Sequence, residues 1–244
     1  MNRLALALAF SVLSTAAAAQ NPAESCAPET PGPSAPTGSD WANLAKYRDA
    51  DARLGPPAEG ERRVIFFGDS ITEYWKLGDS FPGKAYIDRG ISGQTTPQLR
   101  LRFCQDVLAL KPAVVVILAG TNDIAGNTGP TTDEAIEGNL SFLAELAKRN
   151  GIAVILASIL PTARYPWKPD VRPVERILAI DAWIKVYTGK NGLIFLDYYP
   201  AMVDDRHGLK AELSGDGVHP NPAGYAVMAP LAEEAVERAL KPSR

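Results

Sequence analysis

The side chains that could do chemistry fall in four short motifs spread along the chain. Residues 68–70 (GDS) carry a serine hydroxyl, residues 91–95 (ISGQT) a glycine-rich turn, and residues 120–123 (GTND) a side-chain amide. Residues 215–220 (GDGVHP) place an acid three positions before a histidine. Each motif alone is ordinary turn chemistry, because small and polar residues favour turns. Together they supply a nucleophile, a base, a carboxylate and hydrogen-bond donors.

These residue types fit nucleophilic catalysis by a serine. A serine hydroxyl becomes a useful nucleophile only when a base takes its proton, and the base needs a carboxylate to orient it. We therefore expect Ser70 to be the nucleophile, His219 the base and Asp216 the orienting carboxylate. The chain has only two histidines, and the other, His207, follows a strongly polar run and is expected to be a solvated loop residue.

The negative charge of a tetrahedral intermediate needs donors that are already in place. The backbone N–H groups of Ser70 and Gly93 and the side-chain amide of Asn122 are available, and a glycine at position 93 lets substrate approach the backbone closely. These three residues are the expected oxyanion hole. Asp69 and Asp123, the neighbouring acids, are expected to support the turns.

The elements that position these motifs alternate between strand and helix. Continuous apolar runs predict strands, and longer periodic segments predict helices between them. Runs without polar alternation indicate strands that are buried on both faces, hence a parallel sheet between layers of helices. In such sheets ligand groups gather beyond the carboxyl ends of the strands, where the motifs fall. The expected strands cover residues 64–68, 85–89, 113–120, 152–159 and 193–197, and the expected helices 41–54, 96–110, 132–149, 174–190 and 222–240.

Other enzyme classes on α/β sheets lack their motifs here. The chain has neither GxGxxG after its first strand nor GxxxxGK[ST], which disfavours a nucleotide-dependent enzyme. It also lacks GxSxG, the nucleophile elbow of α/β-hydrolases.

The motifs GDS, ISGQT, GTND and DGVHP, in this order, resemble the four blocks of the SGNH/GDSL hydrolase superfamily. The resemblance covers roughly residues 62 to 240 and is greatest to bacterial GDSL esterases and platelet-activating-factor acetylhydrolase-like proteins. It implies a flavodoxin-like three-layer α/β/α sandwich with a five-stranded parallel sheet. It also implies that the four name-giving residues are Ser70, Gly93, Asn122 and His219. The serine mechanism uses only groups of the chain itself, so we expect that no cofactor is needed.

The N-terminal residues predict export. Arg3, a short apolar run and small residues at Ala17 and Ala19 are typical of a signal peptide spanning residues 1–19. The run is shorter than the about 20 residues of a membrane span, so we expect no span in the mature chain. Residues 20–40 form a Pro-rich tail or linker, followed by a single hydrolase domain at 41–244.

Export has a consequence for the two cysteines. In the periplasm or the medium, Cys26 and Cys104 could form a disulfide that ties the tail to the body, or stay as two thiols. The domain is expected to open with a helix at 41–54 that is capped by Asp40. The apolar residues expected near one face of this helix are Trp41, Leu44, Tyr47 and Leu54.

Three aromatic residues stand close in sequence to the expected cleft. Trp75, Tyr165 and Trp167 are candidates for substrate contact, although core packing is the usual role of aromatic side chains. If the Pro-rich loop at 160–173 borders the site, removal of Trp167 should raise KM more than it lowers kcat.

Composition limits the partners. A net charge of −3 and an isoelectric point near 5.5 provide no basic field for nucleic acid. The chain has no CxxC pair, and Asp204, Asp205 and His207 lack a fourth metal ligand at a recognisable spacing. The leading hypothesis is an exported serine esterase that acts on small short-chain esters. A carbohydrate O-deacetylase and a non-catalytic binding module are the alternatives, and the oligomeric state stays open.

Overall fold

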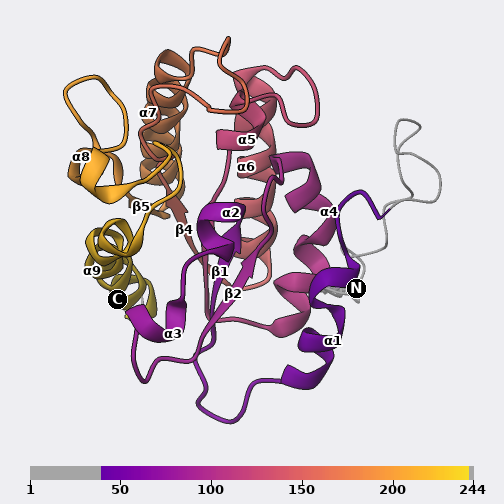
Figure 1. The fold of residues 1–244 in the computed structure, drawn as a ribbon. Helices are drawn as coiled ribbons and strands as arrows, with labels where there is room; N and C mark the ends of the chain where they lie inside the picture. The colour runs from indigo at the N-terminus through magenta and orange to yellow at the C-terminus, as the bar shows by residue number, and fades with distance from the viewer. Residues whose placement is uncertain (1–39, 242–244) are drawn as a thin grey trace, which may run out of the picture. The chain divides into compact units, whose positions relative to one another are not determined.

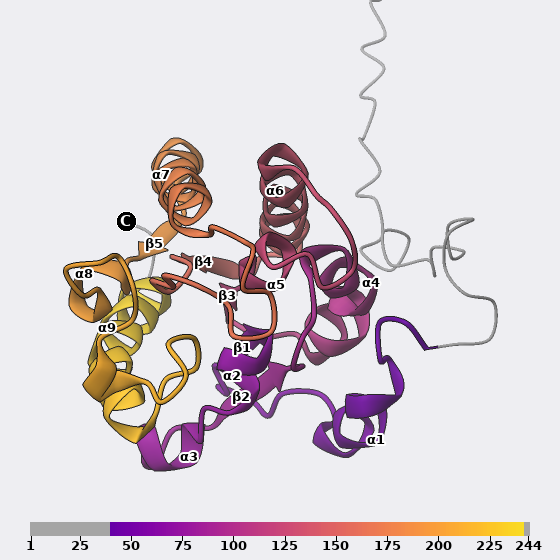
Figure 2. The same cartoon turned by 45° about the horizontal axis from the view of Figure 1, so that its top comes forward.

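Five short strands form the centre of the computed structural model, which describes residues 40–241. The strands are β1 (Val64–Gly68), β2 (Tyr86–Gly90), β3 (Val114–Leu118), β4 (Ala153–Ala157) and β5 (Ile194–Leu196). They pair in parallel in the order β2-β1-β3-β4-β5. Four of them are labelled in Figure 1 and all five in Figure 2. The prediction of a five-stranded parallel sheet is confirmed. The register aligns Gly68 with Gly90 and Leu118, so the carboxyl ends of the three strands lie at one edge.

Helices cover both faces of the sheet. In Figure 2, α6 (Asp133–Arg149) and α7 (Val174–Asn191) lie on one side and α9 (Pro222–Leu240) lies on the other. Side chains of a strand point alternately to the two faces, so β1 contributes to two cores. Ile65 and Phe67 pack with α4 (Thr96–Asp106), α6 and α7, while Val64 and Phe66 pack with α9. Most of the buried side chains on both faces are aliphatic or aromatic, as the apolar strand sequences predict, although the buried Arg102 guanidinium packs on the Phe67 ring.

The helix predicted at 96–110 is shorter than expected. Helix α4 ends at Asp106, and a 3₁₀ turn, η2 (Leu108–Leu110), follows it. Thr95 and Gln98 form a capping box at the start of α4, with each side chain bonded to the backbone of the other residue. The helix therefore begins directly after the ISGQT turn.

Four one-turn helices were not predicted. They are α2 (Ser70–Glu73), α3 (Leu77–Ser80), α5 (Thr121–Ile124) and α8 (Tyr199–Met202). A further 3₁₀ turn, η3 (Ala211–Leu213), precedes the GDGVHP motif. One turn is too short to show a helical hydrophobic period, so pattern reasoning misses it. Helices α2 and α5 matter most, because they begin at the GDS and GTND motifs.

The first helix begins later than predicted. Helix α1 is Ala45–Leu54, whereas the expected start was residue 41. Asn43 has a φ of 56°, which is outside the helical region. Asp40 still caps the turn, because its carboxylate accepts the backbone N–H groups of Leu44 and Ala45 at 2.7 and 2.8 Å. The expected apolar face is also incomplete, since Leu54 is 38% exposed.

Several predictions concern residues that the structure does not describe. The predicted signal peptide at 1–19, the Pro-rich tail before residue 40 and Cys26 lie outside the described residues. The pairing of Cys26 with Cys104 therefore stays a prediction. Between residues 40 and 241, no helix combines the length and the hydropathy that crossing a membrane requires.

Candidate active site

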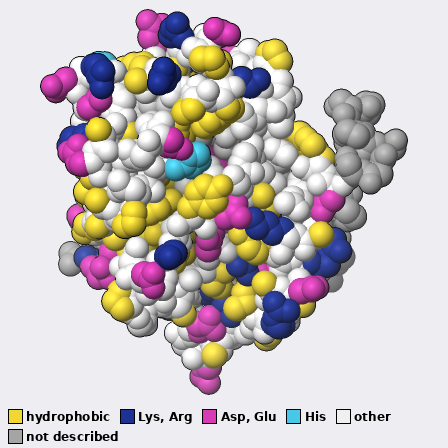
Figure 3. Space-filling model, in the orientation of Figure 1, with side chains coloured by type: hydrophobic (Ala, Val, Ile, Leu, Met, Phe, Trp, Pro, Cys, Tyr) yellow, Lys and Arg dark blue, Asp and Glu magenta, His cyan; other side chains and the backbone are white. Residues whose placement is uncertain are grey.

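The three residues predicted to act as nucleophile, base and carboxylate lie in one hydrogen-bonded row. The Ser70 Oγ atom lies 2.9 Å from Nε2 of His219, and Nδ1 of His219 lies 2.7 Å from Oδ2 of Asp216. Ser70 is buried, whereas His219 is partly exposed. The space-filling view shows a histidine at the surface beside hydrophobic side chains and an acid (Figure 3). The row runs from the interior outwards.

The row also fixes the tautomer of the histidine. Burial would raise the pKa of the Asp216 carboxyl, but hydrogen bonds from the His219 ring and from the backbone N–H groups of His219 and Val218 outweigh it and lower the pKa to about 2. An ionised carboxylate can only accept, so the neutral imidazole carries its proton on Nδ1. Nε2 is then free to accept the hydrogen bond of the Ser70 hydroxyl.

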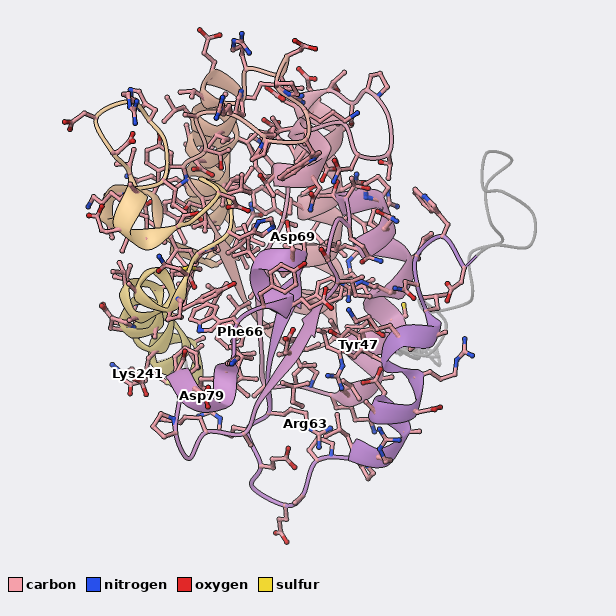
Figure 4. All side chains as sticks on the ribbon, in the orientation of Figure 1. Tyr47, Arg63, Phe66, Asp69, Asp79 and Lys241 are labelled. Atoms are coloured by element: carbon pink, nitrogen blue, oxygen red, sulfur yellow. The ribbon has the colours of Figure 1, made fainter. Side chains whose placement is uncertain are left out.

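The turn from β1 into α2 presents Ser70. Asp69 is the N-cap of α2, and its Oδ1 accepts the backbone N–H of Ile71 at 3.0 Å. Figure 4 shows Asp69 where β1 passes into α2, beyond Phe66 on the strand. Asp69 is fully buried, which raises its pKa to about 7, and its second carboxylate oxygen has no hydrogen-bond partner. Its role as a turn residue fits these contacts.

Helix α2 can approach the sheet because residue 90 is a glycine. A Cβ atom on Gly90 would lie 2.2 Å from the backbone N of Glu73 and 2.7 Å from the carbonyl O of Asp69. Any side chain at this position would push α2 outwards and move Ser70 with it. The glycine at the end of β2 therefore sets how deeply Ser70 is placed.

The loop that carries Asp216 and His219 is folded around Ser214. The Ser214 hydroxyl donates to the carbonyl O of His219 at 2.7 Å and accepts the backbone N–H of Gly217 at 2.9 Å. A β-bridge joins Ser214 to Pro220. These contacts join the two ends of the loop. They therefore fix the turn in which Asp216 and His219 lie close to each other.

The three expected oxyanion donors lie on segments that contact one another. The backbone N–H of Ile91 donates to the carbonyl O of Gly68 at 3.1 Å, which ties the ISGQT turn to the GDS turn. Asn122 is buried, and its Nδ2 donates to the carbonyl O of Gln94 at 3.0 Å. Gly93 has a φ of 77°, a left-handed conformation that glycine adopts without strain.

One contributor near Asn122 was not singled out from the sequence. Asn127 Nδ2 donates to Oδ1 of Asn122 at 2.7 Å, and Asn127 Oδ1 accepts the indole N–H of Trp167 at 3.0 Å. The only sequence signal was its place in a loop of glycines and small polar residues just after GTND. Such a loop gives no reason to prefer one asparagine.

The aromatic predictions need a correction. Trp75 and Tyr165 are 3% and 0% exposed, so neither ring is available to a substrate. Trp75 packs against the rings of Phe66, Phe81 and Tyr225, whereas the Tyr165 hydroxyl bonds to Thr121. Their positions close to the motifs in the sequence suggested substrate contact. In the structure, however, neighbouring side chains bury both rings.

Two exposed rings lie against His219 instead. Trp167 is 40% exposed, and its ring centroid lies 6.2 Å from that of His219 with the planes inclined by 28°. Tyr74 is 51% exposed, at 5.5 Å from the same imidazole. Tyr74 was missed, although it stands four residues after Ser70 and therefore on the same side of a helical turn.

A buried arginine fixes the strand ends beneath the site. The Arg102 guanidinium donates to the carbonyl O of Gly68 at 2.7 Å, to that of Arg89 at 2.8 Å and to the Gln94 side chain. Asp106 balances its charge at 2.9 Å. Arg102 therefore connects the GDS turn, β2 and the ISGQT turn.

The segment before β1 also supports the ISGQT turn. Gln94 Nε2 donates to the carbonyl O of Ala42 at 2.7 Å, and the Tyr47 hydroxyl donates to the carbonyl O of Gly90. Tyr47 extends from α1 towards the sheet in Figure 4. Residues 40–54 therefore contact the turn that carries Gly93, although no motif indicated it.

His207 lies away from this row. It is exposed, has a φ of 60°, and its Nδ1 lies 3.2 Å from the Tyr199 hydroxyl. Within the part of the chain that the structure describes, no three His, Cys, Asp or Glu side chains are grouped as metal ligands.

A serine, a histidine and an acid in one hydrogen-bonded row, at the edge of a parallel α/β sheet, is the arrangement expected of a serine hydrolase. Residues 66–227 match the model of the GDSL-like Lipase/Acylhydrolase family, and the chain belongs to that family. It is thus an esterase of the GDSL type, a class with a serine nucleophile. Membership of this enzyme family argues against the alternative of a non-catalytic binding module.

The chain is also similar to solved and curated proteins. A GDSL-like lipase from Bacteroides thetaiotaomicron is 44% identical, with a TM-score of 0.79 over 82% of this chain and 99% of that one. The Bacillus subtilis protein YqeF, an uncharacterized lipoprotein, is 32% identical over 44% of this chain, and the match spans about half of YqeF (52%). An acetylxylan esterase from Geobacillus stearothermophilus is 26% identical over 68% of this chain and 90% of its own length.

Proposed function

We propose that this protein hydrolyses short-chain carboxylic esters through an acyl-enzyme formed on Ser70. The observation that carries the proposal is the row from Ser70 Oγ to His219 Nε2 and from His219 Nδ1 to Asp216, with distances of 2.9 and 2.7 Å. Each contact in the row is within hydrogen-bond range, and the tautomer is the one that a general base needs.

The proposed reaction has two halves. His219 Nε2 takes the Ser70 proton while Oγ attacks the ester carbonyl, and the same proton then passes to the leaving alcohol. Water next attacks the acyl-enzyme, with His219 again as base, and Ser70 leaves with the proton. Asp216 stays ionised throughout and stabilises the imidazolium that forms in each half.

The oxyanion of each tetrahedral intermediate would be bound by the backbone N–H groups of Ser70 and Gly93 and by Asn122 Nδ2. The Asn122 amide has one hydrogen on the carbonyl O of Gln94, which leaves the second for the oxyanion. Donors that are fixed before the reaction stabilise developing charge without reorganisation.

Hydrolysis of p-nitrophenyl esters from acetate to palmitate tests the proposal. We expect turnover to be greatest with acetate or butyrate and to be lost in Ser70→Ala, with an unchanged melting temperature. Wild-type rates in folded Ser70→Ala would exclude Ser70 as the nucleophile. A maximum at palmitate would exclude the short-chain preference but leave the nucleophile standing.

A carbohydrate O-deacetylase is the second candidate, and one observation favours it. The exposed rings of Tyr74 and Trp167 flank His219, which must protonate the leaving alcohol. Flat aromatic faces suit the apolar faces of a sugar ring. The relative from Geobacillus stearothermophilus is an acetylxylan esterase, which supports the same reading. Acetate release from acetylated xylan, compared with p-nitrophenyl acetate at equal enzyme concentration, distinguishes the two candidates.

We also propose that the protein is exported to the periplasm or the medium. The support is the signal-peptide pattern of residues 1–19, together with the lipoprotein among its relatives. Cell fractionation and N-terminal sequencing test it, and the expected mature chain begins at Gln20. An intact Met1 in the cytoplasmic fraction would overturn this proposal.

A further inference from the structure

Two asparagines and a tryptophan form a hydrogen-bonded chain from the surface to the expected oxyanion hole. Trp167 Nε1 donates to Asn127 Oδ1 at 3.0 Å, Asn127 Nδ2 donates to Asn122 Oδ1 at 2.7 Å, and Asn122 Nδ2 donates to the carbonyl O of Gln94 at 3.0 Å. The three side chains come from the loop after β4, the loop after α5 and α5 itself. Every member donates in the same direction, inwards.

The direction of this chain is set at its two ends. An indole N–H can only donate, and a backbone carbonyl can only accept. At the outer end Trp167 requires an oxygen from Asn127, which turns the Asn127 NH₂ group towards Asn122. At the inner end the carbonyl O of Gln94 requires an NH₂ group from Asn122. Both amides therefore have one orientation that satisfies all partners.

A turn of the Asn122 amide by 180° would be harmful to the proposed chemistry. It would bring Oδ1 against the carbonyl O of Gln94, and would remove the spare N–H from the oxyanion position. Asn127 opposes this turn directly, because its Nδ2 needs an acceptor. Asn127 Nδ2 also lies 3.4 Å from the carbonyl O of Gly93, a second acceptor on the same side.

Asn127 is itself held in place by the backbone. Its N–H donates to the carbonyl O of Asn122 at 3.0 Å, so residues 122–127 form a closed loop. The side chain is exposed, and on its outer side Trp167 provides the only N–H donor within the described residues to its Oδ1. The same Trp167 ring lies against His219.

We infer that Asn127 is a positioning residue that holds the Asn122 amide in its donating orientation, and that the Trp167 indole N–H sets the orientation of Asn127. This inference rests on the proposed function, because it assigns a task to residues around the proposed oxyanion hole. Trp167 then has two separable parts: an N–H that acts on kcat through the asparagines, and a ring that contacts the site.

A double-mutant cycle between Asn127 and Asn122 tests the inference, with p-nitrophenyl acetate as substrate. Asn122→Ala is expected to lower kcat by about 10²–10³-fold, and Asn127→Ala by about 10-fold or more, but less than Asn122→Ala. KM should change little, because the oxyanion charge exists only in the transition state. In the Asn122→Ala background, Asn127→Ala should cause no further loss.

Two further variants test whether Asn127 orients the Asn122 amide or only packs beside it. Asn127→Asp keeps the shape but faces Asn122 Oδ1 with an acceptor, so it should lower kcat more than Asn127→Ala does. Trp167→Phe keeps a ring but removes the N–H, so it should lower kcat in the wild-type background and not in Asn127→Ala. Trp183→Phe on α7 and Asn150→Ala at the end of α6 are the matched controls, and neither should change kcat.

The results distinguish a failure of the role of Asn127 from a failure of the proposed esterase activity. If Asn127→Ala and Asn122→Ala multiply their losses of kcat, Asn127 acts independently of Asn122 and the inference is wrong, while the esterase proposal stands. If Asn122→Ala leaves kcat unchanged, both the oxyanion assignment of Asn122 and the inference fail. Ser70→Ala, measured beside them, decides the esterase proposal separately. Melting temperatures confirm that each variant is folded.

Discussion

Asp216 holds His219 at two places, the ring and the backbone. Its Oδ2 accepts the ring Nδ1–H at 2.7 Å, and its Oδ1 accepts the backbone N–H of the same residue at 2.8 Å. One carboxylate therefore limits both the rotation of the imidazole and the position of the loop that carries it. A spacing of three residues makes this possible, because the chain turns back within a single loop.

Asp216→Asn should therefore disable the base without unfolding the protein. The amide can still accept the backbone N–H, but its NH₂ group would face the ring Nδ1–H and favour the wrong tautomer. We expect kcat to fall by about 10³–10⁴-fold, as for the corresponding change in other Ser-His-Asp sites. Steady-state kinetics and thermal unfolding of the variant check this. A loss below about 10-fold would move Asp216 to a purely structural role.

The pH profile should show an acid limb caused by the histidine. A charged imidazole cannot accept the serine proton, so kcat/KM should fall as His219 becomes protonated. Asp216 does not cause this limb, because its pKa is lowered to about 2. Its contribution to stability is complete above the unfolded pKa of about 3.9, decreases progressively as the pH falls below that value, and is gone below about pH 2. Activity in a pH-stat, with circular dichroism at each pH, separates protonation from unfolding.

Trp75 and Trp167 should respond oppositely to removal of their rings. Trp75→Ala empties part of the core and should cost about 3–5 kcal/mol of stability, with KM unchanged in the protein that remains folded. Trp167→Ala should leave the melting temperature unchanged and raise KM about 3- to 10-fold relative to Trp167→Phe, through the lost ring contact. Equal KM values for the Ala and Phe variants would remove the ring from the substrate site.

The buried pair of Arg102 and Asp106 should be far more important for stability than an exposed pair of the same spacing. Arg102→Met leaves the Asp106 carboxylate unpaired in the interior, which should cost about 3–5 kcal/mol. The control is Arg149→Met, because Arg149 and Glu145 are also four residues apart but lie exposed. Its cost should be below about 0.5 kcal/mol. Chemical denaturation of both variants gives the comparison, and equal costs would contradict it.

Asp181 should make the folded protein less stable as the pH rises. Burial, assisted by the charge of Asp197, raises its pKa to about 8, and its Oδ2 atom has no hydrogen-bond partner. Between about pH 4 and pH 8 the folded state keeps a proton that the unfolded state has released, so the free energy of unfolding falls with rising pH.

The test is the slope of stability against pH in Asp181→Asn. The variant cannot ionise, so its stability relative to wild type should increase by at most about 1.4 kcal/mol per pH unit over this range. Oδ1 of the new side chain can still accept the backbone N–H of Ile159. Asp205→Asn, at an exposed position, is the control and should leave the slope unchanged. Parallel curves for Asp181→Asn and wild type would refute the prediction.

Features that depend on a short stretch of sequence could be predicted, whereas contacts between residues far apart in the sequence could not. Four of the five strands were clear in the sequence, because a run such as 114–118 is apolar on both faces, whereas β2 (YIDRG) gave a weaker signal. The motifs also indicated that Ser70, Asp216 and His219 belong together, and the structure places them in one hydrogen-bonded row, while their catalytic roles stay a prediction. The contact of Asn127 with Trp167 was not predicted, since the two residues are 40 positions apart in the sequence.

The failures have physical causes of the same kind. Trp75 and Tyr165 were expected at the cleft from their place in sequence, but burial is decided by which neighbours pack over them. The start of α1 was set four residues too early, because Asp40 bonds to two N–H groups across a turn that is not helical. Neither the burial of these two rings nor the turn after Asp40 can be predicted from the neighbouring residues in the sequence.

The segment before β1 makes this protein's folding unit longer than its family signature. The matched family region begins at residue 66, yet Gln94, Gln98 and Gln105 donate to the carbonyl oxygens of Ala42, Trp41 and Leu44. A recombinant fragment trimmed to the family boundary would leave these three glutamine amides, which lie in the ISGQT turn and along α4, without these acceptors. For protein engineering, the useful N-terminal cut therefore lies before Asp40, and a fusion partner joined directly to β1 would replace part of the enzyme's own scaffold.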